Sequence, residues 1–256
     1  MILNQENYFS TEASMKYMGV SQFKSFEKCE AEGLAKANGT FEKEKTVALL
    51  VGSYVDAHFE GTLDVFKAKN PEIFTQKGEL RAEYKKANEI INRIESEPEF
   101  MVFLSGEKQV IMTGEIEGVP VKIKIDSYFP DEKIVDLKVM KDFEPIWKDG
   151  SKVPYFEAWG YDLQAAVYQE IVRQNTGKQL PFYIAAATKE PVTDIQGLLM
   201  PQEFLDERLS YFKGLVRHYD NIKKGIEQPE RCEKCDYCKS TKHFEVINAA
   251  DFYYQD

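Results

Sequence analysis

The sequence lacks any stretch that could serve as a membrane span or a secretion signal. None of its apolar runs approaches the roughly 20 residues that a helix needs to cross a bilayer. The first ten residues, MILNQENYFS, have neither the basic start nor the apolar core of a signal peptide. We therefore expect a cytoplasmic protein without a membrane partner.

The sequence also lacks an excess of basic residues, internal repeats and low-complexity tracts. Its 33 lysines and arginines are outnumbered by 43 acidic residues, which gives a net charge of −10. This balance argues against indiscriminate binding of nucleic acid, although a local basic groove could still hold phosphates. Because no linker divides the chain, we expect residues 1–256 to form a single domain.

Cysteine is scarce, and in a reducing cytoplasm the four cysteines are expected to be thiols or metal ligands rather than disulfides. Cys232, Cys235 and Cys238 form a C-x2-C-x2-C run, and Cys29 lies far upstream. Four thiolates suit tetrahedral zinc, whereas the spacing of the run is also typical of ferredoxin-type clusters. Unligated thiols are the third possibility, and either metal would join the two ends of the domain.

Hydrophobic periodicity predicts helices in the first part of the chain and strands in its centre. The expected helices cover residues 21–39 (from a Ser21 N-cap to Gly39), 45–61, 81–97 (stopped by Pro98), 155–177 and 201–225. The expected strands cover residues 107–116, 119–129, 132–139, 181–188 and 194–200.

This order predicts an α/β fold with a mixed central sheet flanked by helices. We expect a helical N-terminal part at 20–100, a catalytic sheet core at 105–200, and a C-terminal helix with the cysteine segment at 201–256. The helix after the central hairpin should supply a parallel crossover.

The central hairpin carries two carboxylates, Asp126 and Asp136, on either side of a predicted turn at 130–132. With that turn, Asp126 lies opposite Asp136, and Lys124 lies opposite Lys138. Facing carboxylates repel each other unless a cation sits between them. Oxygen ligands favour Mg²⁺ or Mn²⁺ over zinc.

Lys138 shares a strand face with Asp136, so it could orient a water molecule or hold a phosphate oxygen. A divalent cation, two carboxylates and an ammonium group are the components needed to hydrolyse a phosphodiester. A solvent-facing hairpin with a surface Asp–Lys pair is the alternative, because D-x9-D-x-K is a short pattern.

The segments KIKID and VDLKV around these residues resemble the core motif of the PD-(D/E)XK nuclease superfamily, in its RecB-like exonuclease branch. In the same order, VSQFKSFEKCE resembles the opening helix of that branch, GSYVDAHFEG its upstream histidine helix, and YDLQAAVYQE its Q-x3-Y element. The resemblance covers residues 20–240 and is greatest to phage and prophage recombination exonucleases.

This resemblance implies a restriction-endonuclease-like core and assigns roles to individual residues. It implies metal ligation by His58, Asp126, Asp136 and the backbone carbonyl of Leu137, with catalytic roles for Lys138, Gln164 and Tyr168. Other members of the branch join one early and three late cysteines through an iron–sulfur cluster. A [4Fe-4S] cluster on Cys29, Cys232, Cys235 and Cys238 is therefore expected, with zinc as the alternative because the last interval is short.

The expected partner is DNA, in the form of linear duplex ends, together with a recombinase or single-strand annealing protein. Lys124, Lys141 and Lys148 are candidate DNA contacts, and the last two lie in a segment that alternates cations with aromatic residues. The leading hypothesis is a metal-dependent exonuclease. A structure- or site-directed endonuclease and a non-catalytic DNA-binding protein on the same fold remain the alternatives, and an oligomer is left open.

Overall fold

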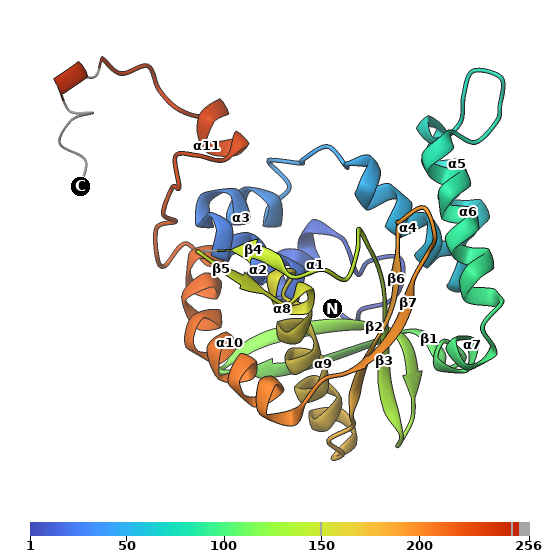
Figure 1. Cartoon of the computed structure of the whole chain (residues 1–256). Coiled ribbons are helices and arrows are strands. Elements are labelled where there is room, and N and C mark those ends of the chain that lie inside the picture. The colour runs from blue at the N-terminus through green and yellow to red at the C-terminus, as the bar shows by residue number, and fades with distance from the viewer. Residues whose placement is uncertain (149, 247, 251–256) are drawn as a thin grey trace.

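A five-stranded mixed sheet lies at the centre of the computed structural model, which describes residues 1–148, 150–246 and 248–250 (Figure 1). Its strands are ordered β1-β2-β3-β6-β7, and only the β3–β6 pair is parallel. The bounds are β1 (Glu107–Ile116), β2 (Val119–Phe129), β3 (Lys133–Met140), β6 (Phe182–Thr188) and β7 (Ile195–Leu199). The predicted α/β class and the five strands are confirmed.

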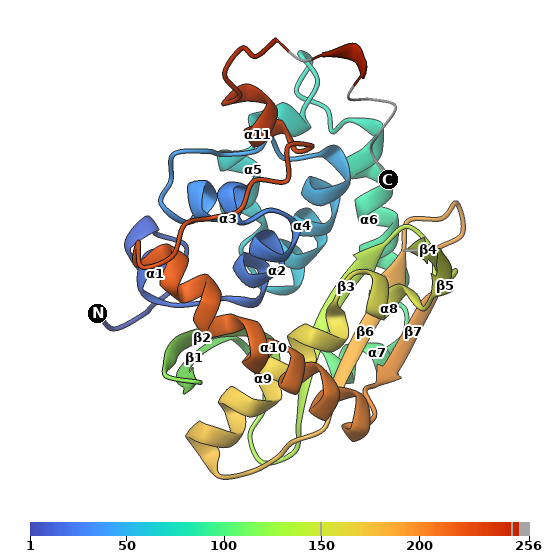
Figure 2. The same cartoon turned by 90° about the vertical axis from the view of Figure 1, so that its left-hand side faces the viewer.

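Helices cover both faces of the sheet (Figures 1 and 2). On one face lie α9 (Tyr161–Thr176) and α10 (Gln202–Lys223), which share a core with Ile134 of β3. On the other lie α4 (Val47–Phe59) and α6 (Ala82–Glu95), which pack with Val135. Buried faces on both sides explain the apolar runs of the parallel pair. The connection from β3 to β6 passes through α9, as predicted for the crossover.

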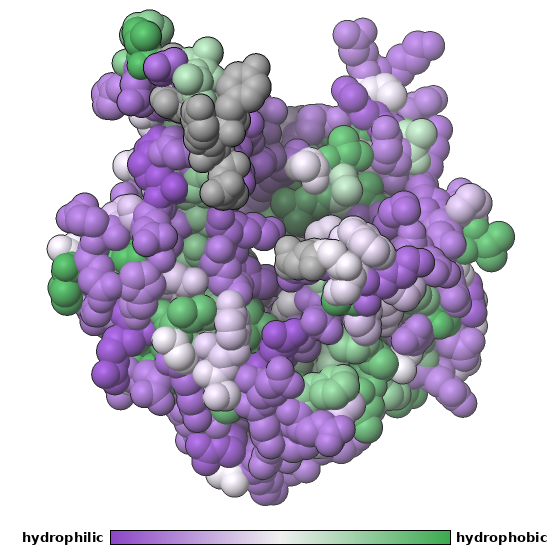
Figure 3. Space-filling model, turned by 60° about the vertical axis from the view of Figure 1, so that its left-hand side comes forward, coloured by the Kyte–Doolittle hydropathy of each residue, from purple (hydrophilic) through white to green (hydrophobic). Residues whose placement is uncertain are grey.

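Shorter elements complete the structure. They are α1 (Thr11–Lys16), α2 (Val20–Lys28), α3 (Glu30–Ala37), α5 (Leu63–Lys69), the 3-10 helix η1 (Pro71–Ile73), α7 (Pro98–Phe103), β4 (Ile146–Lys148), β5 (Ser151–Val153), α8 (Tyr155–Ala158) and α11 (Asp236–Ser240). Within the described ranges, no helix has the length and apolar character that a membrane crossing requires. The face in Figure 3 is mostly hydrophilic, with separate small hydrophobic patches.

The helix predicted at 21–39 is two helices, and this corrects the sequence-based boundaries. The chain adopts an extended conformation at Cys29 (φ −168°, ψ 115°), so α3 folds back against α2. The first of these two helices, α2, begins at Val20 with Gly19 as its N-cap, whereas the predicted N-cap was Ser21. The break turns the Cys29 sulfur towards the C-terminal cysteines, a long-range contact that periodicity does not reveal.

Two other predicted helices each show a backbone feature at one end. The helix predicted at 81–97 ends at Glu95, before Pro98 as predicted, and Pro98 itself begins α7, since proline is tolerated in a first helical turn. The helix predicted at 155–177 is interrupted at Gly160, whose φ of +64° is left-handed. Its predicted end at Gly177 is confirmed.

The fold of α3 on α2 requires the absence of a side chain at position 33. A Cβ on Gly33 would lie 2.9 Å from the Phe26 ring and 3.0 Å from the Phe26 Cα. We expect Gly33→Ala to lower the free energy of unfolding by about 1–3 kcal/mol through overpacking, measured by urea denaturation. The matched control is Gly214→Ala in α10, where a Cβ meets nothing within 4 Å. It should instead stabilise by about 0.5–1 kcal/mol, and equal effects of the two substitutions would contradict this packing argument.

Candidate active site

The central hairpin has the register predicted from its turn. Phe129 pairs with Lys133 and Ser127 with Val135, so the loop between the strands is the three residues at 130–132. Continuing this register places Asp126 across from Asp136. The sequence allowed this prediction because turn length fixes hairpin register.

The β2–β3 ladder ends where the two acids begin, and the N-terminal half of β2 pairs with β1 on one edge and with Met18 on the other. At this opening the Leu137 N–H donates a hydrogen bond of 3.1 Å to Asp126 Oδ2. The carboxylate thus takes the place of a strand partner for that N–H group.

Donors from three elements orient the two carboxylates. Gln109 Nε2 of β1 donates to Asp126 Oδ1 at 3.2 Å, and Gln164 Nε2 of α9 donates to Asp136 Oδ1 at 2.7 Å. Lys138 forms an ion pair with Asp136 Oδ2. The structure therefore brings together the predicted residues Asp126, Asp136, Lys138 and Gln164.

The two aspartates together carry more charge than the Lys138 ammonium group beside them. Burial of Asp136, which is 2% exposed, raises its pKa to about 7, with a further contribution from Asp126 and an opposing one from Lys138. Burial alone would lower the pKa of Lys138, but the charges of Asp136 and Asp126 raise it, so the lysine stays protonated. Neighbouring carboxylates in a low-dielectric site favour a bound cation or a shared proton.

A further acid, Asp56 of α4, lines the same small cavity as Asp126 and was not among the predicted site residues. Partial burial and then the charge of Asp126 raise the pKa of Asp56 well above its usual range. The predicted ligand His58 lies two residues later, about 200° around the helix. The structure does not bring His58 to the aspartates, because its Nε2 lies 2.7 Å from Glu95 Oε1.

A small cavity of about 10 Å³ lies on the α4 side of Asp126. Asp56, Glu60, Gln109 and Asp126 line it, among other residues, and its size matches one ion or one water molecule. Asp56 and Glu60 lie four residues apart at the end of the apolar helix α4, and this spacing could have been recognised in the sequence. Gln109 could not, since its position depends on strand pairing.

Comparison with known proteins agrees with this geometry. Residues 19–241 match a family described as "PDDEXK-like domain of unknown function" (DUF3799). The chain belongs to this PDDEXK-like family. The predicted membership of the PD-(D/E)XK superfamily and the restriction-endonuclease-like core are thereby confirmed.

A crystal structure from Eubacterium rectale, described as "Putative exonuclease", is 49% identical and has a TM-score of 0.95, covering 99% of this chain and 98% of that one. The structure SSO0001 is 12% identical over 82% of this chain and 87% of that one, and its TM-score of 0.29 is too low to indicate a shared fold. No curated protein matches this sequence. The family and the Eubacterium rectale relative support a nuclease.

The other predicted site residues of this PDDEXK-like protein include Tyr168, Lys124 and Lys141. Tyr168 follows Gln164 by one turn of α9, is 8% exposed, and lines a cavity of about 160 Å³ with Gln164 and Lys24. Lys124 Nζ lies 5.1 Å from the centroid of the Phe9 ring. Lys141 is exposed and pairs with Asp142.

A larger cleft of about 460 Å³ extends from Lys24 and includes Lys28, Lys148 and Trp159 in its lining. Lys24 lines both this cleft and the cavity beside Gln164, and burial, and then the charge of Lys138, lower the pKa of Lys24 to about 8. The Trp159 side chain is largely exposed rather than packed in the core. Of the three lysines predicted to contact DNA, Lys148 is thus one that lines a cleft next to the site.

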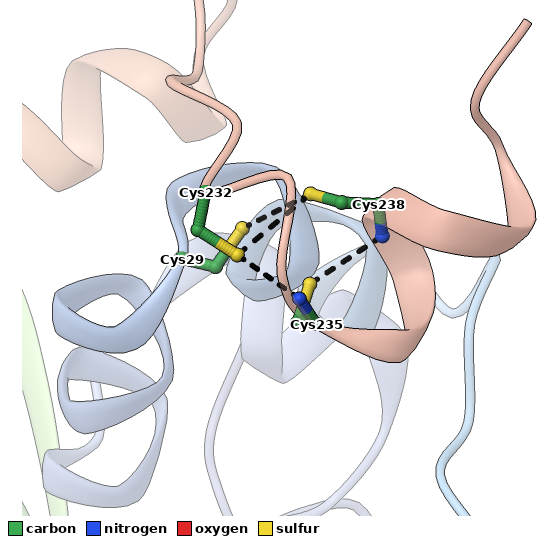
Figure 4. A group of neighbouring side chains, drawn as sticks. All are labelled: Cys29, Cys232, Cys235 and Cys238. Carbon is green, nitrogen blue, oxygen red and sulfur yellow. Dashed lines mark hydrogen bonds between the residues drawn. The ribbon is translucent and has the colours of Figure 1, made fainter. Parts of the chain in front are cut away.

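The four cysteines form a second site, between α2, α3 and the C-terminal segment (Figure 4). Their Sγ atoms all lie within 4.8 Å of one another, with Cys29 and Cys232 at 3.5 and 4.0 Å from Cys238. In the described part of the chain, no other group of three or more His, Cys, Asp or Glu residues is as close. Hydrogen bonds from the N–H groups of Lys234 and Cys235 lower the pKa of Cys232 to about 6, which favours the thiolate that binds metals.

The different orientations of Asp56 and His58 lead to a prediction about cation binding. Mg²⁺ or Mn²⁺ at a hundredfold excess over its Kd should stabilise the protein by about 2.7 kcal/mol, measured as a rise in melting temperature. Asp56→Asn should remove most of this rise because it deletes a carboxylate from the group. His58→Gln should leave the rise intact, and the reverse pattern would restore His58 as the ligand.

Proposed function

We propose that the protein is a Mg²⁺- or Mn²⁺-dependent deoxyribonuclease that degrades linear DNA from its ends, of the phage or prophage recombination and repair type. The observation that carries this proposal is the pair of facing carboxylates at the opening of the β2–β3 ladder, with Lys138 ion-paired to one of them. The 49% identical relative is described as "Putative exonuclease", which supports cleavage from chain ends.

The donors at the opening fit a hard cation, because they are carboxylate and carbonyl oxygens. Asp126, Asp136, Asp56 and the backbone carbonyl of Leu137 would hold it. The bound cation would polarise the scissile phosphate and lower the pKa of a water molecule.

The remaining residues would act on the phosphate and on the ligands. Lys138, whose pKa is raised by its acidic neighbours, carries the positive charge that stabilises negative charge developing on the phosphate. Gln164 holds the Asp136 carboxylate in one orientation through its 2.7 Å hydrogen bond. Tyr168 closes the site on the α9 side, where its burial excludes water and strengthens these charge interactions.

The cleft beside Lys24 would hold the DNA strand that leads to the site. Lys148 and Lys28 would contact phosphates, and the exposed Trp159 ring would stack on an unpaired base. The exposed Lys141 and the half-buried Lys124 are further candidate phosphate contacts. A local groove of this kind is compatible with the acidic net charge of the chain, since phosphate binding depends on where the cations lie.

Asp136→Asn tests the proposal directly. With Mg²⁺ or Mn²⁺ the wild-type protein should degrade end-labelled linear duplex and leave closed circular DNA intact. The variant should lose about 10²-fold or more in rate, because it removes a carboxylate ligand whose supporting partners alone are worth about 10–100-fold. Asp64→Asn, at an exposed acid in α5, is the matched control and should retain full activity.

Other outcomes of the same assay would support one of the two alternative functions, an endonuclease or a non-catalytic DNA-binding protein. Cutting of the circle by the wild type would establish an endonuclease. DNA binding without cleavage of either substrate would identify a binding protein on a nuclease fold.

For the cysteine site we propose one structural zinc ion. Tetrahedral coordination with Zn–S bonds of about 2.3 Å separates the sulfurs by about 3.8 Å, close to the 3.5 and 4.0 Å seen here. A [4Fe-4S] cluster places four iron atoms between the sulfurs and would need a wider arrangement. The ion would fasten Cys29, between α2 and α3, to the C-terminal segment.

Metal analysis distinguishes a zinc ion from an iron–sulfur cluster. The purified protein should be colourless and contain one zinc ion per chain, and Cys238→Ser should lower both the zinc content and the melting temperature. A brown protein with stoichiometric iron and acid-labile sulfide would instead establish the cluster.

A further inference from the structure

The β4–β5 hairpin forms a two-stranded sheet of its own, outside the central sheet (Figure 2). Its register pairs Ile146 with Val153 and Trp147 with Lys152. Paired residues share a face and successive residues alternate, so Trp147 and Lys152 lie on one face and Ile146 on the other. Lys148 shares the face of Ile146 for the same reason. The hairpin therefore has two chemically distinct faces.

One of these faces is turned towards the body of the protein. Ile146 packs against the main core on the α9 side, and Lys148 lines the cleft of about 460 Å³ together with Trp159. The opposite face, formed by Trp147 and Lys152, therefore points away from the body, and we call it the outward face. Both of its side chains are exposed, Trp147 to 70%.

The exposed tryptophan ring on the outward face requires a physical reason. Tryptophan is highly buried on average, because its ring can remove about 150–250 Å² from water. The sequence has two tryptophans, and both are more than half exposed, Trp147 on the outward face and Trp159 in the cleft. An exposed ring beside a lysine suits a nucleic-acid strand, since the ring stacks on a base and the ammonium group contacts a phosphate.

The cleft on the other side of the hairpin is too small for a duplex. Its volume of about 460 Å³ falls within the roughly 300–1,000 Å³ of sites for drug-sized ligands, so it holds a short stretch of one strand. When that strand of a duplex passes Lys148 into the cleft, its complement must remain outside. The outward face is the surface of the hairpin that the complement would then meet. Hairpin residues 146–153 carry two lysines and one aspartate in a chain with a net charge of −10, so this hairpin is locally positive.

We propose that the β4–β5 hairpin divides the two strands of a DNA end: Lys148 faces the strand that enters the cleft, and the outward face, Trp147 and Lys152, binds the complementary strand. This inference rests on the proposed nuclease and extends it, because it makes a base-paired end rather than a free single strand the preferred substrate. Stacking of an unpaired base on Trp147 offsets part of the unstacking that strand separation requires.

Binding of two DNA ligands tests the hairpin in the Asp136→Asn background, in which the DNA should remain intact. The ligands are a forked duplex, whose strands are unpaired at one end, and one of its strands alone. Trp147→Ala should weaken binding of the fork about fivefold or more and leave the single-strand affinity unchanged. Lys152→Ala should lower the salt dependence of fork binding by about one phosphate contact. Lys148→Ala, next to Trp147 but on the other face, should weaken binding of both ligands. The matched control is Lys85→Ala, an exposed lysine of α6, and should change neither.

Tryptophan fluorescence reports on the two sides of the hairpin separately. Trp159→Phe leaves Trp147 as the only tryptophan of the sequence, and Trp147→Phe leaves Trp159. The forked duplex should quench both reporters. The single strand, at a concentration that saturates the cleft, should quench Trp159 alone.

The outcomes separate the hairpin inference from the nuclease proposal. Equal losses for both ligands in Trp147→Ala, or equal quenching of Trp147 by the single strand and the fork, would overturn the assignment of the outward face to the complementary strand. Unchanged binding of both ligands in Trp147→Ala would also overturn it, and cleavage by the wild-type protein would leave the nuclease standing. A wild-type protein that neither binds nor cleaves either DNA would overturn both proposals.

Discussion

Two carboxylates facing each other across one hairpin, the buried Asp136 and the half-buried Asp126, are the constraint on which the rest of the site depends. Asp126 and Asp136 repel each other, and a low-dielectric surrounding strengthens that repulsion. The structure relieves it by ion-pairing one acid with Lys138 and by giving each acid hydrogen-bond donors. The charge that remains is what would make the site a receptor for a divalent cation and, through it, for a phosphate.

The fold supplies these donors through its topology. The opening between β2 and β3 frees the Leu137 N–H for Asp126, and the crossover from β3 to β6 sets the first turns of α9 over Asp136. On the opposite face α4 contributes Asp56 to the same charges. Helices on both sides of the sheet thus contribute to one pair of carboxylates, and the cysteine site brings Cys29, between α2 and α3, next to the segment at 232–238.

Local signals explain what could be predicted from the sequence. Alternation located the strands, and the three-residue turn fixed the register of Asp126 and Asp136. Gln164 came instead from the resemblance of YDLQAAVYQE to the Q-x3-Y element of the nuclease branch. The features that escaped prediction depend on tertiary contacts. The break at Cys29 accompanies a contact with a distant cysteine, and the rotation of α4 puts Asp56 rather than His58 beside Asp126. The position of Gln109 depends on the pairing of β1 with β2.

The most direct test of this account is the position of the cation itself. Anomalous diffraction from crystals soaked in Mn²⁺ would locate the ion independently of activity. The account predicts an anomalous peak bounded by Asp126 and Asp56, at the opening between β2 and β3. A peak between His58 and Glu95, or none near the hairpin at saturating Mn²⁺, would contradict it.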